Sequence, residues 1–276
     1  MDSFRLDFVG VGPQRTGTSW LHQLLQHHPA LCFPKDVKET MFFDQYYEKG
    51  LDWYVSYFTH YKSGQLRGEI GPTYFDAPSV PALIHNLNPA CKIIVNLRDP
   101  IERAFSLYLH HQSRGRLDVP FREAASKIPR IVEAGRYAVH IPRWLETFGE
   151  KQVSILFLED IDAQPQGVLK ETYDFLGVEA IEMPEEGNEK IGALMTPRFG
   201  WLGKVGGKTL TWLRSNRFHG IVETAKRLGV KKVYTQDKSG KPELDTDDRR
   251  WLLKQYEQDI VFVEKLTGRD LVAWRG

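Results

Sequence analysis

Gly12-Pro13-Gln14-Arg15-Thr16-Gly17-Thr18-Ser19 is the most informative segment of this chain. It follows a short apolar run at residues 6–11, which predicts a buried strand. Behind it, apolar residues recur at helical spacing: Trp20, Leu21, Leu24 and Leu25. A strand, a glycine-containing turn and a helix N-terminus in this order present backbone N–H groups and a positive dipole end to an anion. The stretch therefore predicts a phosphate-binding loop.

Two further strands are predicted downstream of this loop. Residues 92–97 form an apolar run that ends in the turn Arg98-Asp99-Pro100, and Pro100 suits the first turn of a following helix. Residues 153–158 form the third run, followed by a helix that stops at Gly177. Strands that alternate with helices indicate a parallel sheet covered on both faces, with ligands at the carboxyl ends of its strands.

We therefore expect an α/β fold with a central parallel sheet flanked by helices, in one domain over residues 1–276. An irregular basic segment at 183–242 lies within that domain. Between residues 198 and 241 there are eleven lysines and arginines against two carboxylates. Such a segment could attract an anionic acceptor, a nucleotide or a membrane surface, or could be a solvated insertion.

Composition excludes several classes of protein. The chain has 276 residues, 41% of them hydrophobic and 26% charged, which is typical of a globular protein rather than a disordered or fibrous one. No apolar run approaches the roughly 20 residues that cross a bilayer. The N-terminus enters a strand almost at once, without a signal-peptide pattern, and Cys32 and Cys91 do not suggest a disulfide framework. We expect a cytoplasmic protein with no nucleic-acid partner.

The loop departs from the nucleoside-triphosphate loop G-x-x-x-x-G-K-[ST], because Thr18 occupies the lysine position and Arg15 is the basic residue instead. The missing lysine would have bridged the β- and γ-phosphates of Mg²⁺-ATP. The loop is thus suited to a phosphate but poorly to a triphosphate. A kinase or NTPase with a degenerate loop stays an alternative, as does a non-enzymatic module that binds a nucleotide or polyanion.

Two motifs resemble those of sulfotransferases that depend on PAPS (3′-phosphoadenosine 5′-phosphosulfate). Residues 13–21 resemble the 5′-phosphosulfate loop, in the version found in heparan sulfate N- and 3-O-sulfotransferases. Residues 97–108 resemble the segment that binds the 3′-phosphate. The similarity extends through residues 38–43, 50–54 and 135–138 and covers most of the chain up to about Val178. The tail around residues 266–271 is similar to that of stand-alone bacterial members.

The resemblance implies transfer of a sulfonate from PAPS, with PAP as the product and no metal. The residues it assigns to the nucleotide are Arg15, Thr16, Gly17, Thr18, Ser19, Arg98, Ser106 and Lys241. Residue chemistry supports Arg98 independently, because a guanidinium at the end of a buried strand needs an anionic partner. The alternative partner is a carboxylate at Asp99 or Glu102. Ser106 could equally pack within its helix, and Lys241 could belong to a solvated turn.

The resemblance also implies that Glu39 is the general base and that Arg15 stabilises charge during transfer. The family carries lysine at position 15, and arginine keeps the charge but cannot donate a proton. Glu69 is a second candidate base, or a partner of Arg15. It is followed by Ile70, where the family often has lysine. A histidine base, at His110 or His111, is a further alternative.

The acceptor is predicted only as a class: a hydroxyl or amine of a small molecule, a glycan or a glycolipid. Tryptophans could stack on sugars or pack in the core: Trp53, Trp144, Trp201 and Trp212. A glycolipid would bring the basic segment 198–241 close to a membrane surface.

Overall fold

A computed structural model of the chain describes residues 4–184, 196–197, 235–236 and 242–276. The chain divides into two compact units. The first consists of Met1–Arg103, Glu133–Gly192 and Tyr256–Gly276, and the second of Ala104–Val132 and Ala193–Gln255. The predicted basic segment at 198–241, with Lys241, lies outside the described residues apart from a short strand.

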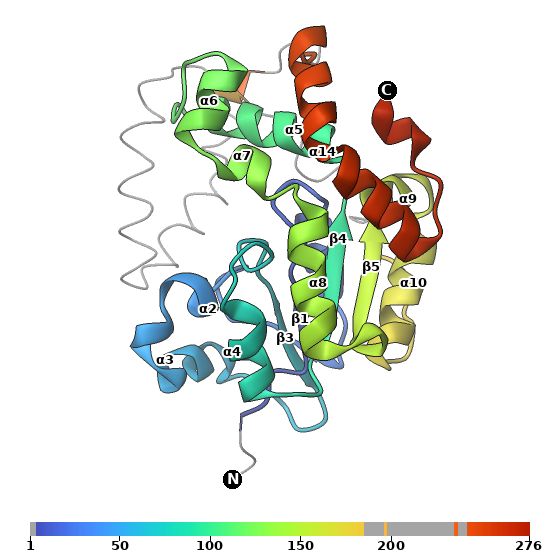
Figure 1. The fold of residues 1–276 in the computed structure, drawn as a ribbon. Coiled ribbons are helices and arrows are strands. Elements are labelled where there is room, and N and C mark those ends of the chain that lie inside the picture. The colour runs from blue at the N-terminus through green and yellow to red at the C-terminus, as the bar shows by residue number, and fades with distance from the viewer. Residues whose placement is uncertain (1–3, 185–195, 198–234, 237–241) are drawn as a thin grey trace. The chain divides into compact units, whose positions relative to one another are not determined.

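The first unit is built on a five-stranded sheet of order β2-β3-β1-β4-β5, in which every pairing is parallel (Figure 1). Its strands are β1 (Phe8–Gly10), β2 (Leu31–Cys32), β3 (Leu66–Ile70), β4 (Lys92–Leu97) and β5 (Val153–Phe157). β1 lies at the centre, with Val9 opposite Glu69 of β3 and Ile93 of β4. Because the strands are parallel, all of their carboxyl ends meet at one edge.

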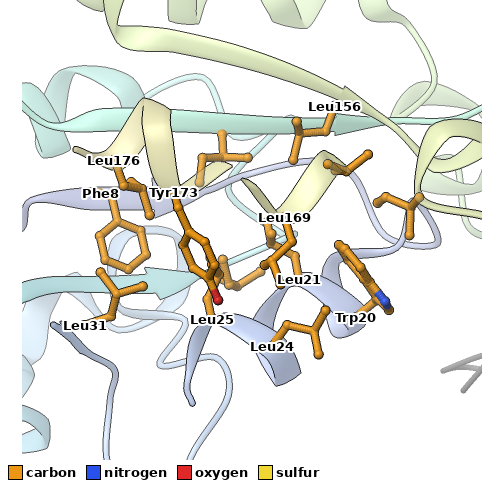
Figure 2. Close-up of a cluster of buried hydrophobic side chains, with 14 of the residues drawn as sticks. Phe8, Trp20, Leu21, Leu24, Leu25, Leu31, Leu156, Leu169, Tyr173 and Leu176 are labelled. Atoms are coloured by element: carbon orange, nitrogen blue, oxygen red, sulfur yellow. The ribbon is translucent and has the colours of Figure 1, made fainter. Parts of the chain in front are cut away.

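One face of the sheet is covered by α1 (Thr18–Leu25) and α10 (Pro165–Leu176). Their apolar sides and the strands form a continuous buried cluster (Figure 2). Its members include Phe8, Trp20, Leu21, Leu24, Leu25, Ile94, Leu156, Leu169, Tyr173 and Leu176. Burial of each leucine-sized side chain contributes about 1.5–3 kcal/mol, so this cluster holds α1 firmly behind the loop that precedes it.

The other face is covered by α8 (Tyr137–Phe148), which packs against β4 and β5, and by α4 (Val80–Leu87), which packs against α8 (Figure 1). Trp144 of α8 is fully buried, and its indole N–H donates to the carbonyl of Phe75. The sheet is therefore buried on both faces, as the apolar runs predicted. Shorter helices complete this unit: α2 (Phe42–Gln45), α3 (Leu51–Val55) and α9 (Leu158–Ala163).

The second unit contains most of α5 (Pro100–Ser113) and α7 (Arg130–Glu133), all of α6 (Phe121–Lys127), and the first part of α14 (Thr246–Thr267). α6 contacts α14 through Arg122, whose guanidinium pairs with Asp248 at 2.6 Å and lies over the Trp251 ring. A two-stranded antiparallel pair joins β6 (Thr196–Pro197) to β7 (Thr235–Gln236). Within the described ranges, no helix is both long and apolar enough to cross a membrane.

The α/β class and the parallel sheet are confirmed, and the three predicted strands and the helices after them form where expected. β4 spans Lys92–Leu97 as predicted, and α10 ends at Gly177, which adopts the left-handed conformation. β2 and β3 were not predicted. β2 has only two residues and β3 contains a glycine, so neither shows an apolar run.

The start of the loop lies unusually close to β4. A methyl group on Gly12 would lie 2.5 Å from the backbone nitrogen of Asn96 and 2.6 Å from its Cβ. We therefore expect Gly12→Ala to lower the free energy of unfolding by about 2 kcal/mol, because the strand would have to move. Urea unfolding measures the change.

The matched control is Gly167→Ala in α10, where the nearest atom to the added methyl is 3.7 Å away. Alanine there should leave stability unchanged or raise it by about 0.5–1 kcal/mol, since glycine is a weaker helix former. If the two variants had equal free energies of unfolding, the close approach of Gly12 to Asn96 would be contradicted.

Candidate functional site

The loop between β1 and α1 is closed by its own side chains and backbone. The buried Thr16 hydroxyl donates to the carbonyl of Pro13 at 2.7 Å. Arg15 and Gly17 both have positive φ angles, 79° and 87°. A positive φ is strained for a non-glycine residue and is characteristic of functional sites. Turns of this kind gather successive N–H groups around a concavity that suits an anion.

The loop leads directly into the N-terminus of α1. Gly17 is the residue before the helix, and its carbonyl accepts the N–H groups of Trp20 and Leu21 at 2.9 and 3.2 Å. The first N–H groups of any helix have no carbonyl behind them and carry the positive end of its dipole. Thr18 and Ser19 begin α1, so their hydroxyls lie at this end.

Arg98 joins the end of β4 to the loop. Its Nη1 donates to the carbonyl oxygen of Arg15 at 3.3 Å. The backbone of Arg98 is held in turn by the Tyr137 hydroxyl, which donates to its carbonyl at 2.7 Å. The guanidinium also forms a long ion pair with Glu102, at 3.8 Å. Glu102 is one of the two carboxylates that the sequence offered as an alternative partner of Arg98. The structure thus brings Arg98, at the end of the second predicted strand, into contact with the glycine turn.

The turn after Arg98 is ordered by acidic side chains. The Asp99 carboxylate accepts the N–H of Ile101 at 2.8 Å and so caps α5. The N–H of Asp99 donates to Glu159, which also accepts the indole N–H of Trp274 at 3.0 Å. These contacts fix the backbone from which the Arg98 side chain extends.

Glu39 lies next to the loop through its neighbour Lys38. The Lys38 ammonium is 3.0 Å from Glu39 Oε1 and 3.2 Å from Ser19 Oγ. The Glu39 side chain is 20% exposed, which leaves it accessible to a bound molecule. Lys38 directly precedes Glu39 in the sequence. Its contact with Ser19 joins residues 19 positions apart and could not be read from spacing.

Glu69 is fully buried at the end of β3 and accepts four hydrogen bonds. The donors are the N–H and hydroxyl of Thr40, at 3.2 and 2.8 Å, and the hydroxyls of Tyr54 and Tyr74, at 3.1 and 2.8 Å. Burial raises the pKa of Glu69 to about 7, and these hydrogen bonds offset part of the rise. Glu69 therefore anchors the segment that carries Glu39, a role for which the sequence showed no signal.

The other predicted site residues have different positions. Ser106 is buried on the part of α5 that belongs to the second unit, and Lys241 lies outside the described residues. His110 and His111 also belong to that unit. The roles of these four residues stay predictions.

The buried carboxyl makes stability depend on pH. Because the folded Glu69 has a pKa near 7 and the ordinary value is 4.5, folding takes up a proton between these values. The free energy of unfolding should therefore fall as pH rises through this window, by at most about 3 kcal/mol. Glu69→Gln should remove this part of the slope in urea unfolding curves measured from pH 5 to 8.

Glu171→Gln is the matched control, because Glu171 is exposed on α10. This variant should keep the wild-type dependence on pH. A Glu69→Gln protein with the same slope as the wild type would show that Glu69 does not titrate in this range.

Comparison with known proteins was made by sequence and by structure. The family model for the sulfotransferase domain matches residues 6–192. Bifunctional heparan sulfate N-deacetylase/N-sulfotransferase 2 of Homo sapiens is 33% identical over 192 residues, 62% of this chain and 22% of that protein. The Drosophila melanogaster enzyme of the same description is 30% identical over 206 residues, 63% of this chain and 20% of that protein. The chain thus spans about a fifth of the length of these relatives.

A solved structure shares the fold over almost the whole chain. The sulfotransferase from Alicyclobacillus acidocaldarius matches with a TM-score of 0.73 and 24% identity, over 99% of this chain and 100% of that one. The α/β architecture described above is therefore that of a known sulfotransferase structure.

Proposed function

This chain belongs to the sulfotransferase family, and on that basis we propose that it transfers the sulfonate group of PAPS to a hydroxyl or amine of an acceptor. The observation that carries the proposal is the contact between Arg98 and the carbonyl of Arg15. It brings two anion-binding elements, the glycine turn and a terminal guanidinium, to one edge of the sheet. A nucleotide with phosphates at both its 5′ and 3′ ends matches two such elements.

The residues present fit this donor. The loop from Arg15 to Ser19, with the N-terminus of α1, would hold the 5′-phosphate end, and Arg98 would hold the 3′-phosphate. By family resemblance alone we also assign Ser106 to the 3′-phosphate. On the same basis we assign Lys241 to the nucleotide. Thr18 in place of a lysine argues against a nucleoside triphosphate, and so against a kinase or NTPase.

Sulfonate transfer has three requirements that the protein must meet. The donor supplies an activated sulfonate, and the chain must hold the leaving phosphate, stabilise charge on the transferring group and take a proton from the acceptor. Preorganised N–H donors of the loop, together with Arg15, serve the first two needs. Arginine stays charged at all physiological pH values, so Arg15 stabilises charge without transferring a proton.

We assign the proton-accepting role to Glu39 rather than to Glu69. Glu39 is partly exposed and lies beside a residue that touches the loop, so an acceptor can reach it. Glu69 is fully buried and engaged by three neighbouring residues, which suits an anchor better than a base. A general base must reach the proton that it removes.

For the acceptor we propose a carbohydrate, free or in a glycolipid, because the sequence relatives are named as heparan sulfate N-sulfotransferases. Aromatic side chains gather on α2, on α3 and on the 3-10 turn between them (Tyr47–Lys49), just after Glu39. Trp53 stacks with Phe42, and Tyr47 is 49% exposed, so this surface offers rings to a sugar. Trp144 serves packing instead, being fully buried. Trp201 and Trp212, like the membrane contact suggested for 198–241, fall outside the described residues.

Nucleotide binding tests the proposal directly by calorimetry. PAP should bind the wild type without magnesium and more tightly than ATP. Arg98→Ala should weaken PAP binding by about 10- to 100-fold, the loss expected for charge-assisted hydrogen bonds. Binding of AMP, which lacks the 3′-phosphate, should change little.

Arg5→Ala is the control, because Arg5 is a largely exposed arginine before the start of β1. It should bind PAP as the wild type does. Unchanged PAP affinity in Arg98→Ala would remove the 3′-phosphate assignment, and an equal loss for AMP would mean that Arg98 acts only by holding the loop.

The base assignment predicts that Glu39→Gln lowers the rate of sulfonate transfer by about 10²- to 10⁴-fold, the usual contribution of a general base. Its affinity for PAP should stay at the wild-type value. The assay follows transfer of labelled sulfonate from PAPS to glycan, lipid and phenolic acceptor pools. Glu48→Gln, an exposed site nine residues later, should transfer normally. Wild-type turnover by Glu39→Gln would show that another group is the base.

A further inference from the structure

Lys38 lies between two groups of the site that carry or attract negative charge. Its ammonium lies 3.2 Å from Ser19 Oγ at the N-terminal end of α1 and 3.0 Å from Oε1 of the Glu39 carboxylate. The side chain is 26% exposed, so the ammonium borders on solvent and is not sealed in the core. One cation thus connects the anion-binding end of the helix to the proposed base.

A third side chain, His22, lies near Lys38. His22 lies one turn further along α1, and its pKa is lowered to about 4 by burial and, second, by the positive charge of Lys38. The imidazole is therefore neutral near pH 7 and does not compete with Lys38 for an anion. Lys38 provides the positive charge over this first turn of α1.

The proposed reaction places two anions close together. The sulfonate of the donor is negatively charged, and so is the carboxylate that must approach the acceptor next to it. Like charges a few ångströms apart repel each other appreciably near a protein surface, so this repulsion would hinder formation of the complex. A cation held between them offsets the repulsion. Arg15, within the loop that receives the phosphate, serves the opposite end of the transferring group.

We propose that Lys38 binds a sulfonate oxygen of the donor, giving up its contact with Ser19 for that oxygen and keeping its contact with Glu39. This inference rests on the proposed function. In the transfer, a new bond forms between sulfur and the acceptor atom as the sulfur–oxygen bond to the 5′-phosphate breaks. The bonding pair leaves with the phosphate, and the acceptor proton passes to Glu39. Lys38 stabilises the sulfonate charge throughout and is a catalytic residue in this sense.

The test compares two nucleotides that differ only by the sulfonate, and it needs no acceptor. Dissociation constants of PAPS and PAP are measured for the wild type, Lys38→Met and Lys38→Arg. Lys38→Met should raise the dissociation constant of PAPS by about tenfold or more and leave that of PAP within about twofold. Lys38→Arg should recover most of the PAPS affinity, because a guanidinium also binds sulfonate oxygens.

Lys35→Met is the matched control. Lys35 is exposed and lies three residues before Lys38, so its substitution removes the same charge from the same segment. It should bind both nucleotides as the wild type does. If Lys38→Met binds PAPS as tightly as the wild type, or loses PAPS and PAP equally, the sulfonate contact is overturned while the proposed function stands. If the wild type binds neither nucleotide, the proposed function itself fails.

Discussion

The hydrogen bond from the Arg98 guanidinium to the carbonyl of Arg15 is the interaction on which the site depends. It requires the loop after β1 and the turn after β4 to lie side by side, which follows from parallel pairing of the two strands. Gly12 lets the start of the loop pass close to the backbone of Asn96, where a Cβ atom would clash. The apolar cluster behind α1 then holds the helix end against this edge. The arrangement of the proposed anion-binding groups at this edge therefore depends on the sheet as much as on the loop.

The two carboxylates of the site differ because of their surroundings. Glu69 is enclosed by Thr40, Tyr54 and Tyr74, so burial raises its pKa and hydroxyl donors hold it in place. Glu39 directly precedes Thr40 in the sequence, but it is partly exposed and is paired with Lys38. Opposed environments of this kind commonly divide roles between two acids at one site. In our proposal the buried carboxyl anchors Thr40, and the exposed one takes the proton of the acceptor.

The distribution of charge around the loop suits an anionic donor in a way that the motif alone does not show. Arg15 and Arg98 lie on the loop and at the end of β4, whereas Lys38 reaches the first turn of α1 from a separate segment. Three basic residues from three separate segments therefore lie on or beside the loop and the first turn of α1. Preorganised charge of this kind stabilises a transition state without reorganisation at the moment of reaction.

Local sequence patterns predicted the α/β class, the strand–turn–helix units that begin near residues 6 and 92, and a phosphate-binding loop, of which the first two are confirmed. These are local features, because apolar periodicity and turn residues act over a few positions. The tertiary structure alone decided the short strands β2 and β3, the burial of Glu69 and the contact of Lys38 with Ser19. Each of these depends on residues distant in sequence that the sheet brings together, and no local pattern encodes such a distance. For the same reason Glu39 and Glu69, the first and the second candidate base of the sequence, have unequal surroundings in the folded chain.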